Sequence, residues 1–118
     1  MDGETIHLYG AAAGARDYVF INDVVRAFVC ALDAPAGTYD VGTSHVASLV
    51  EAATEVCRQT GHAWPTTGEL HYSHAPVAQE SRWLPGWKPQ VTLQDGIART
   101  VAAFQREKAL VTPQEVAA

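Results

Sequence analysis

Residues 14–24 read Gly-Ala-Arg-Asp-Tyr-Val-Phe-Ile-Asn-Asp-Val, and the sequence changes here from strand-like to helix-like. Residues 16–21 are rich in β-branched and aromatic side chains, which favour an extended conformation. Asn22 follows, and its side-chain oxygen can accept a hydrogen bond from an unpaired amide in a first helical turn. These residues therefore predict a strand that leads directly into a helix capped by Asn22.

The helix expected after this stretch covers residues 23–32 and is apolar nearly all round apart from Arg26. Such a helix is expected to be covered on most of its sides. Residues 33–37, Asp-Ala-Pro-Ala-Gly, break the helix. Residues 38–41 then predict a strand that ends at Gly42.

A second helix carries sequence signals at both ends. Ser48 and Glu51 have the spacing of a capping box, in which each side chain accepts a hydrogen bond from the other residue's amide. Gly61 is suited to the left-handed residue that ends a helix. Between these ends, apolar residues recur at the three-four spacing of one helix face: Leu49, Ala52, Ala53, Val56 and Cys57.

The remaining segments predict short strands over residues 5–9 and 69–73 and an irregular stretch over residues 75–89. A third helix begins near Thr92. Its buried stripe is expected to consist of Leu93, Ile97, Val101 and Phe104.

The fold class that follows is α/β, a small mixed α/β domain with about three main helices and a few short strands. Residues 1–110 are expected to form this domain, and residues 111–118 a flexible C-terminal tail. The total of 118 residues is enough for one domain with one modest core. The three tryptophans, Trp64, Trp83 and Trp87, are expected to fill it.

The composition of the chain narrows the range of functions expected for it. The formal net charge is −5 and no stripe of Lys and Arg stands out, so nucleic-acid or anionic-membrane binding is not expected as the main function. The chain has no apolar run of about 18 residues that could span a bilayer, and residues 1–4 do not resemble a secretory signal. A cytoplasmic protein is therefore the default expectation, with Cys30 and Cys57 as free thiols.

Four clusters of residues, taken in this order, resemble the second half of the extended short-chain dehydrogenases/reductases. They are residues 14–24 around Arg-Asp-Tyr, residues 39–43 (Tyr-Asp-Val-Gly-Thr), Ser48 with Leu49, and the Gly-Trp-x-Pro element of residues 85–89, which precedes the helix start at residues 92–96. The chain is similar to the C-terminal, substrate-binding part of the NAD-dependent epimerase/dehydratase family, whose members act on sugar nucleotides.

The resemblance also shows what the chain lacks. The family holds NAD with a Gly-rich turn and moves protons with a Tyr-x-x-x-Lys pair. The sequence contains no Gly-x-x-Gly-x-x-Gly motif. It also has no Tyr-x-x-x-Lys pair, because Leu84 and Phe104 stand four residues before its only lysines, Lys88 and Lys108. The chain alone is therefore expected to bind no cofactor and to catalyse no hydride transfer. It is also expected to self-associate or to need a complementary chain.

The resemblance suggests three substrate-binding residues. The family's arginine that contacts the sugar-nucleotide diphosphate corresponds to Arg16, whose planar guanidinium suits phosphate oxygens. The alternative for Arg16 is an ion pair with Asp17 or Asp40. Tyr18 is expected either to line the same pocket or to be an ordinary half-buried strand residue.

The family's second arginine has no counterpart in residues 75–78, so Arg82 is the candidate replacement. The loop before the Gly-Trp element is also shortened over residues 80–84.

Two other functions remain open. One is a non-catalytic binding or assembly module that kept the family's scaffold. The other is a cofactor-independent enzyme built around His71, His74 and Glu80, with Glu69 nearby. The spacing of His71 and His74 does not match a zinc signature.

Overall fold

The computed structural model describes residues 4–72 and 75–110. It confirms a mixed α/β fold with three α-helices and several short strands. The expected tail, residues 111–118, lies outside the described residues. The elements follow in the order β1 (His7–Gly10), 3₁₀ helix η1 (Ala11–Ala13), β2 (Ala15–Arg16), α1 (Ile21–Ala31), β3 (Ala47–Ser48), α2 (Leu49–Thr60), β4 (Thr66–Leu70), 3₁₀ helix η2 (Glu80–Arg82) and α3 (Leu93–Leu110).

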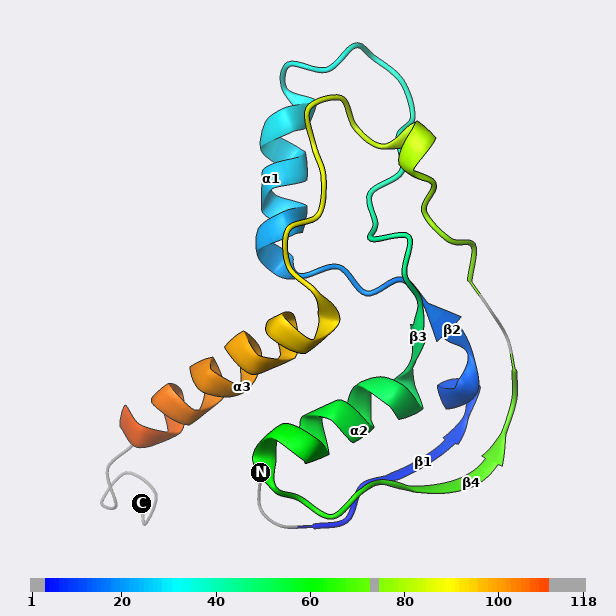
Figure 1. Cartoon of the computed structure of the whole chain (residues 1–118), viewed down its shortest axis with the longest axis vertical. Coiled ribbons are helices and arrows are strands. Elements are labelled where there is room, and N and C mark those ends of the chain that lie inside the picture. The colour runs from blue at the N-terminus through cyan, green and yellow to red at the C-terminus, as the bar shows by residue number, and fades with distance from the viewer. Residues whose placement is uncertain (1–3, 73–74, 111–118) are drawn as a thin grey trace.

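The strands form two separate pairs (Figure 1). β1 and β4 pair in parallel although they lie far apart in the sequence, and His7 is opposite Thr66. β2 and β3 are antiparallel, with Arg16 opposite Ala47. The strands expected near residues 5–9 and 69–73 are thus present. The first is shifted away from the chain start and the second toward it, each by a few residues.

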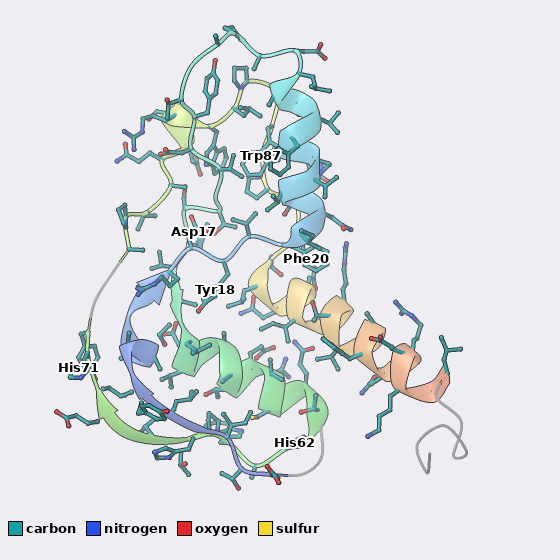
Figure 2. All side chains as sticks on the ribbon, turned by 180° about the vertical axis from the view of Figure 1, so that it is seen from behind. Asp17, Tyr18, Phe20, His62, His71 and Trp87 are labelled. Atoms are coloured by element: carbon teal, nitrogen blue, oxygen red, sulfur yellow. The ribbon has the colours of Figure 1, made fainter. Side chains whose placement is uncertain are left out.

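A small core lies between α1 and the segment that follows η2. Ala27 of α1 packs there against Leu84 and Trp87. The indole of Trp83 meets that of Trp87 edge to face, with ring centroids 5.6 Å apart. Figure 2 shows Trp87 beside α1 and Phe20 where α1 approaches α3. Trp87 and Trp83 therefore fill a core as expected, whereas Trp64 is 66% exposed.

One buried carboxylate ties this core together. Asp23, only 1% exposed, accepts hydrogen bonds from the backbone N–H groups of Gln90 and Val91, at 3.1 Å for the closer Asp23 oxygen in each case. Arg26 pairs with the same carboxylate and also donates to the Lys88 carbonyl at 3.0 Å. The Trp87 indole N–H donates to the Asp23 carbonyl at 2.9 Å. The first turn of α1 thus holds residues 87–91 in place.

The second helix matches its sequence signals. Ser48 caps α2, its hydroxyl accepts from the Glu51 N–H at 3.1 Å, and the Glu51 carboxylate accepts from the Ser48 N–H at 2.9 Å. Gly61 ends the helix in the left-handed region at φ 74°. Cys57, on the apolar face of α2, is buried. Cys30 and Cys57 are both free thiols.

The first helix departs from expectation in two ways. Phe20, not Asn22, precedes the first helical residue, and Asn22 lies inside the first turn without capping it. The helix is also covered on one face only, because Ile21, Val25 and Phe28 are largely exposed within this chain. The fixed point at its start is the tertiary contact of Asp23, which a local sequence pattern does not reveal.

Three further expectations were wrong. Residues 38–41 form no strand and contribute only an isolated bridge between Asp40 and Trp83. Residues 17–20, expected to be a strand, are irregular after β2 ends at Arg16. In α3, Leu93, Ile97 and Val101 are half-buried and Gly96 is buried, but Phe104 is 61% exposed. The helix runs past the elements that cover its first turns, as Figure 1 shows.

The chain is open in shape. Its radius of gyration is 17.5 Å, against about 13.5 Å for a compact domain of this length. Within the part that the structure describes, no helix is both long and apolar enough to cross a membrane.

Candidate functional site

A cavity of about 420 Å³ brings two of the three predicted site residues together. The β1–η1–β2 segment curves beside α2 (Figure 2), and Leu49 at the start of α2 contributes to the lining of the cavity. We call it the Arg16 cavity. It is lined by His7, Leu8, Tyr9, Ala11, Ala12, Gly14, Arg16, Tyr18 and Leu49.

Arg16 is the cationic side chain of this cavity. Its strand position is fixed by pairing with β3, and one guanidinium nitrogen donates to the Ala15 carbonyl at 2.8 Å. The two carboxylates considered as its ion-pair partners are engaged elsewhere: Asp17 binds residues 43 and 44, and Asp40 pairs with Arg82. The guanidinium carries five N–H donors, so more than one contact is possible.

Asp17 orders a turn. Its carboxylate accepts from the Thr43 N–H at 2.9 Å and from the Ser44 N–H at 3.0 Å. Gly42 lies so close to this carboxylate and to Ala78 that a Cβ at position 42 would overlap both. The turn therefore fixes the segment leading to β3, the strand that pairs with Arg16.

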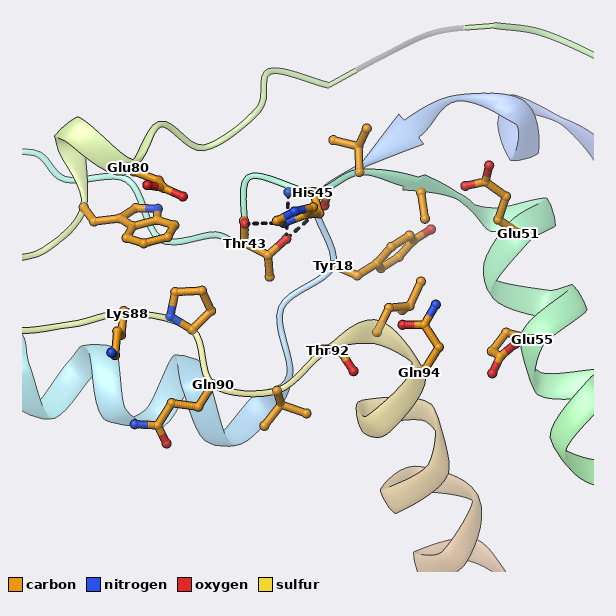
Figure 3. Close-up of a pocket in the computed structure, with 16 residues that line it drawn as sticks. Tyr18, Thr43, His45, Glu51, Glu55, Glu80, Lys88, Gln90, Thr92 and Gln94 are labelled. Carbon is orange, nitrogen blue, oxygen red and sulfur yellow. Dashed lines mark hydrogen bonds between the residues drawn. The ribbon is translucent and has the colours of Figure 1, made fainter.

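Tyr18 also lines a second, larger hollow of about 710 Å³, which we call the Tyr18 groove. Figure 3 shows Tyr18 there with Thr43 on one side and Glu51 on the other. The groove lies between the start of α2, the start of α3 and the segment before α3. It is lined by Tyr18, Thr43, His45, Val46, Ala47, Glu51, Glu55, Glu80, Trp83, Lys88, Pro89, Gln90, Val91, Thr92, Leu93 and Gln94.

Two carboxylates that line the Tyr18 groove, those of Glu51 and Glu55, have partners within the chain. Glu51 belongs to the α2 capping box. Hydrogen bonds from the Arg58 guanidinium and then from the Gln59 amide lower the pKa of Glu55 to about 2. These two acidic side chains are therefore engaged within α2 and its cap.

Arg82, the third predicted residue, lines neither the Arg16 cavity nor the Tyr18 groove. It pairs with Asp40 at 3.0 Å and is exposed. The Gln79 N–H, and with it Arg82, holds the pKa of Asp40 below its ordinary value. The structure thus places Arg82 where it ties residues 79–82 to Asp40.

The acid–base residues of the third hypothesis are dispersed. His71 follows β4, is exposed, and donates its backbone N–H to the Gly10 carbonyl at 2.6 Å. Glu69 is exposed on β4, whereas Glu80 lines the Tyr18 groove. His74 lies outside the described residues. Among residues 4–72 and 75–110, no group of three His, Cys, Asp or Glu side chains could hold a metal ion.

Two residues of the Arg16 cavity were missed by sequence reasoning. His7 and Tyr9 alternate on β1, and their rings lie 6.0 Å apart. Tyr9 is largely exposed. The signal was available, because two ring-bearing side chains on one face of a strand, directly before a small-residue loop, mark a surface that can stack on a flat ligand.

The Gly10–Gly14 loop does not supply a dinucleotide site. It contains η1, a single 3₁₀ turn, and leads into β2. A dinucleotide-binding turn needs a long helix whose N-terminus faces the pyrophosphate. The Gly10–Gly14 loop therefore lacks the geometry of a dinucleotide-binding turn.

The family described as NAD dependent epimerase/dehydratase matches residues 1–42 of the chain. UDP-glucose 4-epimerase of Mycolicibacterium smegmatis is 37% identical over 115 residues, covering 89% of this chain and 36% of that protein. The dTDP-D-glucose 4,6-dehydratase of Mus musculus is 27% identical over 112 residues, covering 84% and 32%.

Solved structures agree with these sequence matches. UDP-glucose 4-epimerase of Thermotoga maritima, determined with UDP-glucose, superimposes with a TM-score of 0.73 at 27% identity, over 89% of this chain and 36% of that one. The Thermus thermophilus enzyme, in complex with NAD, gives a TM-score of 0.74 at 28% identity, over 87% and 36%. The chain spans about a third of the length of these relatives, and it belongs, as a fragment of the fold, to the NAD-dependent epimerase/dehydratase family.

Proposed function

We propose that this chain is the nucleotide-sugar binding portion of a sugar-nucleotide epimerase or dehydratase, and that it does not transfer hydride alone. The observation that carries the proposal is the joint placement of Arg16 and Tyr18 on one cavity. The Thermotoga maritima relative, which was determined with UDP-glucose, supports the choice of ligand class.

In this proposal Arg16 binds the diphosphate. A guanidinium presents parallel N–H donors that match two phosphate oxygens, and charge-assisted hydrogen bonds of this kind are among the strongest in proteins. Tyr18 forms the adjacent wall, and His7 and Tyr9 offer ring faces to the rest of the ligand. In this proposal the chain's own residues bind and orient the sugar nucleotide. The redox chemistry belongs to NAD, which another part of the family fold holds.

The test is calorimetric titration of the 118-residue chain with UDP-glucose and dTDP-glucose, with NAD as the negative control. We expect one of the two sugar nucleotides to bind, and Arg16→Ala to weaken the affinity by about 10- to 100-fold, because a hydrogen bond to a charged group contributes about 1.5–3 kcal/mol. The matched control is Arg106→Ala, an exposed arginine of α3. Absence of binding to both sugar nucleotides, or equal loss in the control, contradicts the proposal.

An assembly module is the second candidate, and the uncovered apolar face of α1 favours it. It predicts that Arg16→Ala changes nothing while a substitution on the α1 surface changes association with a copy or a complementary chain. The cofactor-independent enzyme has less support, because Glu80 lines the Tyr18 groove and His71 does not. A role for Arg82 in binding, and a cytoplasmic location, stay predictions.

A further inference from the structure

A further hollow, of about 470 Å³, lies between the start of α1, the segment before α3 and α3 itself. We call it the Arg99 hollow. It is lined by Asn22, Asp23, Val25, Arg26, Gln90, Val91 and Arg99. It is separate from the candidate nucleotide-sugar site, because none of these residues lines the Arg16 cavity.

Arg99 brings a positive charge to this hollow that no carboxylate offsets. Its guanidinium carbon lies 5.7 Å from the centroid of the Phe20 ring, which is the distance of a cation–π contact. Phe20 immediately precedes the first residue of α1 (Figure 2), so this contact holds the guanidinium beside the start of that helix. Among the described residues, no carboxylate pairs with Arg99. Its N–H donors are therefore available to a ligand.

The second guanidinium of the hollow, that of Arg26, is already oriented. One of its nitrogens pairs with Asp23 and also donates to the Lys88 carbonyl at 3.0 Å. These bonds leave the donors of its other two nitrogens unused. The Asp23 carboxylate is buried and already accepts from the backbone N–H groups of Gln90 and Val91. Two guanidinium groups and one buried carboxylate therefore give the hollow a net positive charge.

Two amide side chains and a helix end add neutral donors to the hollow. Asn22 and Gln90 line it, and their side-chain amides make no hydrogen bond within the part of the chain that the structure describes. α1 also begins without a side-chain cap, and the partial positive charge at the start of a helix favours an anion. Val25 and Val91 supply an apolar wall beside these donors.

We propose that the Arg99 hollow binds the phosphate group of a small molecule, at a site separate from the Arg16 cavity. Guanidinium and amide N–H groups donate to phosphate oxygens, and charge-assisted bonds of this kind are strong. A small ligand is favoured over nucleic acid or an anionic membrane, because the net charge of the chain is −5 and the two arginines share one hollow. The ligand is either free phosphate or a phosphate ester whose organic part contacts Val25 and Val91.

The test is an NMR titration of the Arg16→Ala variant of the 118-residue chain with inorganic phosphate and with phenyl phosphate. This background keeps phosphate binding in the Arg16 cavity out of the measurement. We expect saturable shifts of the backbone signals of Asn22 and Val91 and of the side-chain signal of Arg99. Tighter binding of phenyl phosphate assigns the site to a phosphate ester, whereas equal affinities assign it to free phosphate. Sodium chloride at the same ionic strength is expected to produce no saturable shift.

Two further substitutions distinguish a binding site from a structural cluster. Arg99→Gln is expected to weaken phosphate binding about 10- to 100-fold, because it removes a charged hydrogen-bond donor. Asn22→Asp keeps the side-chain shape but adds a negative charge, so it is expected to weaken binding about 10-fold or more. The same aspartate favours the first turn of α1, so the loss of binding is expected without a loss of helix stability.

The matched control is Arg106→Gln, which removes the charge of another exposed arginine of α3 and is expected to leave phosphate binding unchanged. Absence of saturable shifts at Asn22 and Arg99, the same shifts with sodium chloride, or equal weakening by Arg106→Gln would each overturn the proposal. Phosphate binding that survives both Arg99→Gln and Asn22→Asp would overturn it as well. None of these results bears on sugar-nucleotide binding, because Arg16 is absent from every protein in the test.

Discussion

Helices α1 and α2 have similar lengths, 11 and 12 residues, but they are held in different ways. α2 has a capping box at its start and a left-handed glycine at its end. α1 has no side-chain cap, and its first turn is fixed by the bonds of Asp23 to Gln90 and Val91. Local sequence therefore specifies α2, whereas distant parts of the chain specify α1.

The difference also separates two roles. α2 closes the Arg16 cavity and lines the Tyr18 groove, so the helix with strong local signals lies beside the candidate ligand site. α1 leaves Ile21, Val25 and Phe28 largely exposed on one side and holds residues 87–91 on the other. It contributes no lining residue to the Arg16 cavity or the Tyr18 groove.

The largest expected loss of stability in this contrast between α1 and α2 is that of Asp23→Ala. The substitution leaves the Arg26 guanidinium and the N–H groups of Gln90 and Val91 without their acceptor, at an expected cost of about 3 kcal/mol in the free energy of unfolding. Urea unfolding followed by tryptophan fluorescence measures it, since Trp87 reports on this core.

Asp23→Asn is the matched variant, because it keeps one carbonyl acceptor and the side-chain shape. We expect a smaller loss than for alanine. Equal stability of Asp23→Ala and the unmodified chain would show that α1 is held by something other than this carboxylate.

The same experiment on α2 sharpens the contrast. Ser48→Ala removes the hydroxyl that accepts from the Glu51 N–H, and a lost N-cap costs about 1 kcal/mol. Ser48→Asp, which restores an acceptor, is expected to recover most of the stability. A loss as large as that of Asp23→Ala would mean that α2, too, depends on distant contacts.

What the sequence could predict follows the same division. The ends of α2, the start of α3 at Thr92 and the joint placement of Arg16 and Tyr18 depend on short spacings, and a pattern or a family motif captures them. The start of α1 could not be predicted, because Asp23 is bound by residues 67 and 68 positions later in the chain. The exposure of Phe28 could not be predicted either, since it depends on what else is present to cover it.

The smallest expected effect concerns the surface of α2. Hydrogen bonds from Arg58 and then Gln59 lower the pKa of Glu55 from its ordinary 4.5 to about 2. A carboxyl whose pKa is lower in the folded state stabilises that state above its unfolded pKa, and the contribution is lost as the pH falls from about 4.5 toward 2. Arg58→Ala should therefore reduce stability at neutral pH but not at the acid end of this range.

The measurement is the free energy of unfolding of both proteins across that pH interval. The gap between them is expected to close as Glu55 becomes protonated, and to be small throughout because the pair is exposed to solvent and salt. Arg106→Ala, which removes a charge from α3 without such a pair, is expected to show no comparable closing. A gap that stays constant with pH would assign the effect of Arg58 to helix packing, and α2 would then resemble α1 in depending on more than its own sequence signals.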